Sequence, residues 1–125
     1  MKKVWISIIV ALILIALLFA VKPIITGKSV NEEKLAMDGF AQCLTDAGLT
    51  MYGTSWCSHC QNQKKLFGKS FKYINFVDCD RNSQQCALAG VQGYPTWRVN
   101  NQNYPGEQNF ITLGGLTNCE VPNVN

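Results

Sequence analysis

The chain has 125 residues, of which 47% are hydrophobic and 15% charged, and its formal net charge is +3 at pH 7. A chain of this length holds one small domain and, with so many apolar residues, an additional apolar segment. The small net charge argues against a nucleic-acid-binding protein, because such a surface needs clustered positive charge. Four lysines near the middle have the spacing of one solvated helix face: Lys64, Lys65, Lys69 and Lys72.

The apolar residues concentrate near the start of the sequence, where residues 4–21 carry no charge. A helix rises about 1.5 Å per residue, so this run reaches about 27 Å, close to the hydrocarbon thickness of a bilayer. We therefore predict a single transmembrane helix and assign residues 1–22 to an uncleaved membrane anchor. A cleaved signal peptide is the alternative, because the sequence starts with "MKK". Its cleavage site would have to place Leu18 and Ala20 where small residues are usual.

Six cysteines follow the apolar segment: Cys43, Cys57, Cys60, Cys79, Cys86 and Cys119. An even number behind an export-type segment is typical of an oxidising compartment, whereas cytosolic proteins more often use cysteines for metal binding or catalysis. We therefore predict a single-pass membrane protein whose C-terminal domain faces the periplasm, a lumen or the exterior.

Composition divides the rest of the sequence into a linker, a domain and a tail. Residues 23–30 contain turn-forming residues and are predicted to be a linker. Residues 31–118 are assigned to the domain and residues 119–125 to a C-terminal tail. The domain opens with a predicted helix over residues 31–47, which Asn31 would cap. Its apolar stripe is expected to comprise Leu35, Met37, Phe40, Cys43 and Leu44.

Strand and helix patterns alternate beyond this helix. Predicted strands cover residues 49–54, 72–78, 95–99 and 102–104, and predicted helices cover residues 60–68, 83–90 and 107–116. Asn100 and Asn101 are expected to form a tight turn between the last two strands. Helical crossovers favour parallel strands and a tight turn favours an antiparallel pair. The order β-α-β-α-β-β-α therefore predicts an α/β fold with a mixed four-stranded sheet flanked by helices.

The sequence "SWCSHC" at residues 55–60 carries the most specific chemical signal. A cysteine at the first turn of a helix has its thiolate stabilised by backbone amides and the helix dipole, so Cys57 is the predicted nucleophile. Cys60 lies one turn further along the same face and is predicted to resolve a mixed disulfide. A protonated His59 would stabilise the thiolate further and make the disulfide a stronger oxidant.

Other interpretations of this motif stay open. A CxxC pair can be half of a zinc site, although His59 is the only histidine and the other cysteines are scattered. The pair can also be a structural disulfide, although so short a loop adds little constraint. Trp97 and Trp56 can be core aromatics, and Trp56 can instead form a hydrophobic, substrate-binding lip around the sulfur.

The segment "MYGTSWCSHCQNQKKLFG", preceded by "FAQCLTDAGL" and followed by "GYPTW", resembles thioredoxin-fold thiol:disulfide oxidoreductases. It is most similar to the thioredoxin-like domain found fused to, or working beside, bacterial and plastid homologues of vitamin K epoxide reductase. The resemblance covers about residues 40–116. It implies a thioredoxin-like fold with a cis peptide bond at Pro95, and a substrate-facing loop made of Tyr94, Pro95 and Thr96. Ser58 stands where thioredoxin's "CGPC" has glycine and the "CPHC" of periplasmic oxidases has proline.

The four remaining cysteines can pair in three ways if the CxxC cysteines pair with each other. We favour Cys79 with Cys86, because they are seven residues apart between a strand and the following helix. Closing that loop would stabilise the fold by about 2.5 kcal/mol in the chain-entropy view. Cys43 with Cys119 would then tie the first domain helix to the tail, and the alternative is that these two are buried free thiols.

Together these features predict a membrane-tethered thiol:disulfide oxidoreductase. It would use its dithiol, without a further cofactor or a metal, to oxidise the cysteines of exported proteins. The resemblance implies a quinone-linked membrane protein of the vitamin K epoxide reductase type as the partner that reoxidises it. Two alternatives remain: a tethered reductase of the kind that serves cytochrome maturation, and a non-catalytic assembly factor or metal carrier.

Overall fold

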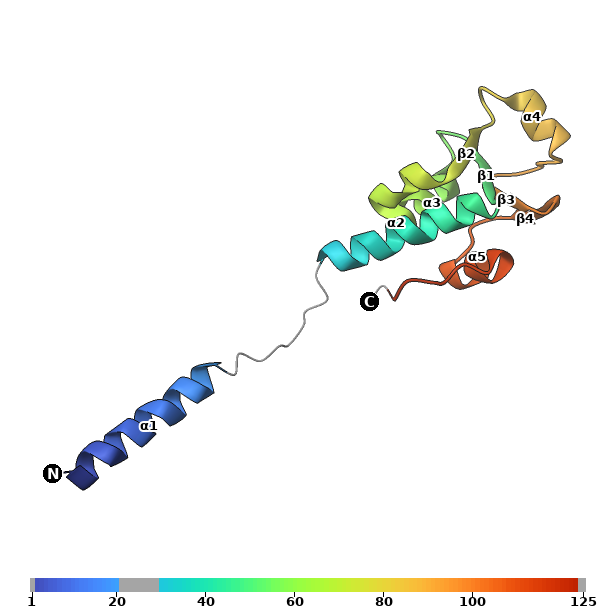
Figure 1. The fold of residues 1–125 in the computed structure, drawn as a ribbon. Coiled ribbons are helices and arrows are strands. Elements are labelled where there is room, and N and C mark those ends of the chain that lie inside the picture. Colours follow the sequence, from blue (N-terminus) through green and yellow to red (C-terminus); the bar gives the residue numbers. More distant parts are fainter. Residues whose placement is uncertain (1, 21–29, 124–125) are drawn as a thin grey trace.

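A computed structural model describes residues 2–20 and 30–123 of the chain (Figure 1). Apart from Val30, the predicted linker of residues 23–30 lies outside the described residues. The first described element is helix α1 (Lys2–Ala20), so the helical conformation expected for the apolar segment is confirmed. None of the described helices has the length and apolarity needed to cross a membrane. The predicted span of residues 4–21 ends at Val21, which lies outside the described residues.

Four strands form one mixed sheet in the spatial order β2-β1-β3-β4. The strands are β1 (Thr50–Gly53), β2 (Asn75–Asp78), β3 (Thr96–Val99) and β4 (Gln102–Pro105). Strand β1 pairs in parallel with β2 and antiparallel with β3, and β3 pairs antiparallel with β4. The predicted mixed four-stranded sheet is confirmed, and its flanking helices make the arrangement consistent with a thioredoxin-like fold.

The predicted turn at Asn100 and Asn101 joins β3 to β4. Both residues have positive φ angles, 51° and 62°. A two-residue hairpin loop needs this left-handed geometry at both positions to match the twist of the strands. Asparagine tolerates the left-handed region better than most residues, so the sequence supplies the turn that the hairpin requires.

The helices after α1 are α2 (Val30–Asp46), α3 (Ser58–Phe67), α4 (Ser83–Leu88) and α5 (Phe110–Thr117). Helix α5 begins later than predicted, because the side chain of Asn109 caps it by accepting a hydrogen bond from Thr112 N at 2.8 Å. Glu107 and Gln108 therefore belong to the loop before the helix. Helix α4 is shorter than predicted, and Asn82 is its N-cap residue.

A 3-10 helix, η1 (Gly68–Tyr73), replaces the first part of the strand predicted over residues 72–78. The segment turns because it lies against α2. Ser70 donates to Asp38 at 2.6 Å, and Thr45 donates to the carbonyl of Tyr73 at 2.7 Å. Strand β2 can begin only at Asn75, whose amide donates back to Thr45 Oγ1 at 3.0 Å.

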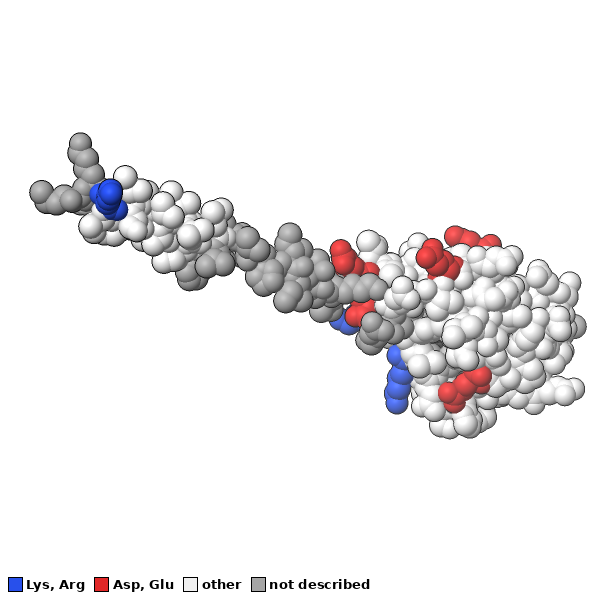
Figure 2. Space-filling view, turned by 90° about the horizontal axis from the view of Figure 1, so that it is seen from below, with Lys and Arg blue, Asp and Glu red and all other residues white. Residues whose placement is uncertain are grey.

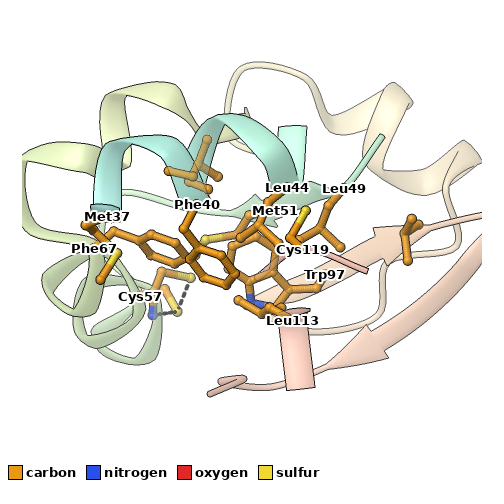
Figure 3. Close-up of a cluster of buried hydrophobic side chains, with 14 residues drawn as sticks. Met37, Phe40, Leu44, Leu49, Met51, Cys57, Phe67, Trp97, Leu113 and Cys119 are labelled. Atoms are coloured by element: carbon orange, nitrogen blue, oxygen red, sulfur yellow. Dashed lines mark hydrogen bonds between the residues drawn. The ribbon is translucent and has the colours of Figure 1, made fainter. Parts of the chain in front are cut away.

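The main hydrophobic core lies between one face of the sheet and helices α2, α3 and α5 (Figure 3). Trp97 on β3 is fully buried at its centre, so it is a core aromatic. The expected stripe of α2 is correct at Met37, Phe40 and Leu44 but wrong at Leu35, which is 72% exposed. Leu35 precedes Met37 by two residues, about 200° around the helix, and therefore lies on the opposite side.

A second, smaller cluster covers the other face of the sheet and contains Tyr52, Val77, Cys79, Cys86 and Ala89. Successive strand residues point to opposite faces, which places Met51 in the main core and Tyr52 in this cluster. The disulfide predicted between Cys79 and Cys86 is present and lies within the cluster. It joins the end of β2 to helix α4.

The disulfide predicted between Cys43 and Cys119 is also present, and it ties α2 to the tail. The tail packs closely on α5. A Cβ atom added at Gly114 would lie 2.6 Å from Val121 Cγ2 and 2.8 Å from the carbonyl oxygen of Cys119. Only glycine permits this close approach of tail and helix.

Charged side chains on the face shown in Figure 2 stand in separate small groups. The lysines predicted to form a solvated helix face do not all extend freely into solvent. Lys64 Nζ lies 3.9 Å from the ring centroid of Phe76, and Lys72 Nζ lies 4.6 Å from that of Tyr73. Each of these two lysines holds its ammonium group over an aromatic ring, in a cation–π contact.

Candidate active site

The CxxC motif lies where β1 leads into α3. Cys57 is the N-cap residue of α3, with an extended backbone, and its Sγ accepts a hydrogen bond from the amide of Cys60 at 3.1 Å. An N-cap side chain satisfies an amide that has no partner inside the helix. A sulfur in this place experiences the positive end of the helix dipole. The predicted position of Cys57 at a helix start is confirmed.

The two thiols are free and differ in their surroundings. Cys57 is 7% exposed and lines an open cleft of about 380 Å³, whereas Cys60 is fully buried. The Cys60 thiol donates to Cys57 Sγ, 2.6 Å away. Burial first, and then this hydrogen bond, raise the pKa of Cys60 to about 12. At neutral pH Cys60 is therefore a protonated thiol, and Cys57 is the sulfur that an incoming group can reach.

Gly53, the last residue of β1, is a site residue that sequence reasoning missed. A Cβ atom at this position would lie 2.8 Å from Cys60 Sγ and 3.2 Å from the Phe76 ring. The absence of a side chain leaves the space that the buried sulfur occupies. Its place directly before the CxxC loop was a signal, since a glycine at the end of a buried strand often marks a close approach.

The cleft beside Cys57 is lined by two aromatic residues, Trp56 and Tyr94, together with Ser58 and His59. The rings of Trp56 and Tyr94 meet edge to face with centroids 6.1 Å apart. Trp56 is 69% exposed, so it forms a lip at the cleft and is not a core residue. Its Nε1 donates to Asp80 Oδ1 at 3.1 Å, a partner the sequence did not indicate.

The loop expected to face a substrate is divided between the cleft and the interior. The Tyr94–Pro95 peptide bond is cis, as the resemblance implied. Tyr94 lines the cleft, whereas Pro95 and Thr96 are buried. The carbonyl of Pro95 accepts from Gly106 N at 2.7 Å, and the Thr96 hydroxyl donates to the carbonyl of Gly93 at 2.8 Å.

His59 lines the same cleft as Cys57, but the hydrogen-bond partner of its ring is Glu107. Nδ1 of His59 lies 2.6 Å from Oε1 of Glu107, 48 positions later in the sequence. The hydrogen bond from His59 lowers the pKa of Glu107. Glu107 was missed because the sequence placed it in the first turn of a helix, where an acidic residue needs no further explanation.

Gln63 is the third residue that sequence reasoning missed. It is fully buried in α3, where its Oε1 accepts from Trp97 Nε1 at 3.1 Å and from Gln108 N at 2.7 Å. Its Nε2 donates to the carbonyl of Gln108 at 3.0 Å. This one side chain joins the CxxC helix to β3 and to the loop that carries Glu107.

Metal coordination is an alternative use of the two thiols. Within residues 2–20 and 30–123, no group of three or more His, Cys, Asp and Glu side chains is placed to hold a metal ion.

The chain resembles thiol-disulfide oxidoreductase LTO1 of Arabidopsis thaliana. The two are 34% identical over 94 residues, which are 68% of this chain and 25% of LTO1. The chain thus matches about a quarter of the relative's length. No protein-family model matches.

A similarity among solved structures is weaker. The crystal structure of a buckwheat glutaredoxin–glutathione complex aligns with 72% of this chain and 94% of the glutaredoxin chain, with a TM-score of 0.40 and 14% sequence identity.

Replacing Gly53 by alanine tests the close approach to Cys60. We expect Gly53→Ala to lower the free energy of unfolding by about 1–3 kcal/mol, because the buried sulfur or the strand has to shift. Closure of the Cys57–Cys60 disulfide should slow for the same reason. Gly39→Ala in α2 is the matched control, since its added Cβ meets nothing within 4 Å. Urea unfolding that shows equal effects for both variants would contradict this account of Gly53.

The unequal burial of the thiols predicts their reactivity. Brief iodoacetamide treatment of the reduced protein at pH 8 should modify Cys57 and spare Cys60, because only a thiolate reacts and the pKa of Cys60 is about 12. The rate at Cys60 should keep rising as the pH approaches that value. Peptide mass spectrometry measures both sites, and protein unfolded in urea is the control, in which the two cysteines should react alike. Equal labelling in the folded protein at pH 8 would refute the assignment.

Proposed function

We propose that the chain is a thiol:disulfide oxidoreductase that acts through Cys57 and Cys60. The observation that carries this proposal is the contact between two free thiols, one facing an open cleft and one fully buried. Exchange needs one sulfur that a partner can reach and a second sulfur close enough to displace that partner. The name of the Arabidopsis relative, a thiol-disulfide oxidoreductase, supports the same chemistry.

The proposed exchange has two steps. In the oxidising direction a substrate thiolate attacks Cys57 Sγ, the Cys57–Cys60 bond breaks, and Cys60 leaves as a thiolate and takes up a proton. A second substrate thiolate then attacks the substrate sulfur of the mixed disulfide, which forms the substrate disulfide and releases Cys57 as a thiolate. Two electrons pass from substrate to protein. In the reverse sequence Cys60 attacks the mixed disulfide and the substrate is reduced.

The direction we propose in the cell is oxidation of cysteine pairs in exported proteins. The helix N-terminus and the histidine beside it stabilise a thiolate at Cys57, and therefore the reduced protein. A more stable reduced form makes the disulfide a stronger oxidant. The contact of His59 with Glu107 favours a second candidate, a tethered reductase, because a carboxylate offsets the positive charge of the ring. The redox potential separates the two. A value near that of thioredoxin, about −270 mV, would overturn the oxidising direction.

We also propose that helix α1 tethers the domain to a membrane, with the domain on the extracytoplasmic side. The uncharged run of residues 4–21 and the exposure of the large apolar side chains from Val4 to Leu17 support an apolar surface as its surroundings. The two disulfides outside the CxxC motif support an oxidising compartment.

A quinone-linked membrane protein of the vitamin K epoxide reductase type is the partner we propose for reoxidation. The sequence resemblance around the CxxC motif supports this assignment. A shared membrane would raise the local concentration of the two proteins and speed an exchange between them.

Single cysteine variants test the exchange. Cys57→Ala should abolish disulfide transfer, because Cys60 is buried and cannot be reached by a substrate. Cys60→Ala is the matched variant: with a disulfide-containing peptide it should accumulate a mixed disulfide at Cys57, visible on non-reducing gels. Unimpaired transfer by Cys57→Ala would sink the proposal. In the membranes of cells that produce it, the Cys60→Ala variant should form a mixed disulfide with a membrane protein of the epoxide reductase type. A mixed disulfide with an apocytochrome would instead support the reductase.

A further inference from the structure

The contact between His59 and Glu107 joins the CxxC motif to a distant loop. His59 Nδ1 and Glu107 Oε1 are 2.6 Å apart, and Asn62 Nδ2 lies 3.4 Å from the same oxygen. His59 is well exposed, with 70% of its side chain accessible, so burial does not fix the ring. Glu107 and the backbone of α3 are what hold it beside the cleft.

The position of Glu107 is itself fixed from the interior. The buried side chain of Gln63 hydrogen-bonds both backbone groups of Gln108, the neighbour of Glu107: the amide at 2.7 Å and the carbonyl at 3.0 Å. On the other side, Gly106 N donates to the carbonyl of Pro95 at 2.7 Å. Anchoring the backbone on both sides of Glu107 limits the positions that its side chain can reach. The fold therefore places the backbone of Glu107 where its carboxylate can reach His59.

We infer that Glu107 is a positioning residue that weakens the disulfide as an oxidant by holding and neutralising His59. This inference rests on the proposed function and specifies how the same site is regulated. A protonated ring near Cys57 stabilises its thiolate and so favours the reduced protein. Glu107 draws the Nδ1 proton of that ring toward itself, and its negative charge offsets the positive charge of the ring. Both effects reduce what the thiolate gains from His59.

The charge on Glu107 can be removed without changing the shape of the side chain. In the full-length chain, Glu107→Gln should shift the equilibrium with reduced and oxidised glutathione toward the reduced protein by about three- to tenfold. For a two-electron couple a tenfold shift corresponds to about 30 mV. His59→Ala should shift the equilibrium in the opposite direction, toward the disulfide. In the His59→Ala background, Glu107→Gln should change the equilibrium less than twofold, because the carboxylate has lost its partner.

Glu120→Gln is the matched control for the loss of one negative charge. Glu120 lines a separate cleft between α2 and the tail, so its removal should leave the equilibrium unchanged. An unchanged potential in Glu107→Gln, a shift toward the disulfide, or an equal shift with and without His59 would each overturn the inference while leaving the proposed function intact. A wild-type chain that does not exchange with glutathione would overturn both. Circular dichroism of each variant confirms that the fold is retained before potentials are compared.

Discussion

The buried amide of Gln63 is the constraint on which the geometry of the site depends. A buried amide without partners costs several kcal/mol, so α3 is held in the one rotation that lets Gln63 meet Trp97 and Gln108. Cys60 lies three residues earlier on the same helix face and is buried with it. The hydrogen bonds of Gln63 therefore also keep Cys60 facing inward, while Cys57 lies at the helix start.

The opposite side of the cleft depends on the second core cluster. Asp80, which accepts from Trp56, directly follows Cys79, and Cys79 N donates to the carbonyl of Gly53 at 2.8 Å. The Cys79–Cys86 disulfide anchors this corner to α4. Trp56 is mostly exposed and would otherwise have few contacts that fix its position. The structural disulfide thus supports the aromatic wall beside the CxxC motif, although its sulfurs are buried and take no part in the exchange.

Local patterns in the sequence predicted the features that local physics determines. The turn at Asn100 and Asn101 and the disulfide between residues seven apart, Cys79 and Cys86, are set by short-range geometry, as is the placement of a CxxC at a helix start. The site residues Gln63 and Glu107 were missed because their contacts join distant segments. Gln63 looks like an ordinary polar residue of an exposed helix, and Glu107 like an acidic residue of a first helical turn, until the fold brings α3 and the loop before α5 together. The 3-10 segment was missed likewise, because its turn is set by packing on α2.

The surroundings of Cys60 change during the exchange in a way that favours its own step. In the reduced protein, burial, the hydrogen bond to Cys57 and the charge of Cys57 raise its pKa, while the backbone of Thr54 and the ammonium of Lys64 lower it. Once Cys57 is bonded to a substrate sulfur it can carry no negative charge and is a poorer hydrogen-bond acceptor. Two of the three effects that keep Cys60 protonated are then weakened or lost, and both opposing effects remain. Cys60 therefore becomes easier to ionise in the mixed disulfide, which helps it to leave as a thiolate in the oxidising direction and to attack in the reducing direction.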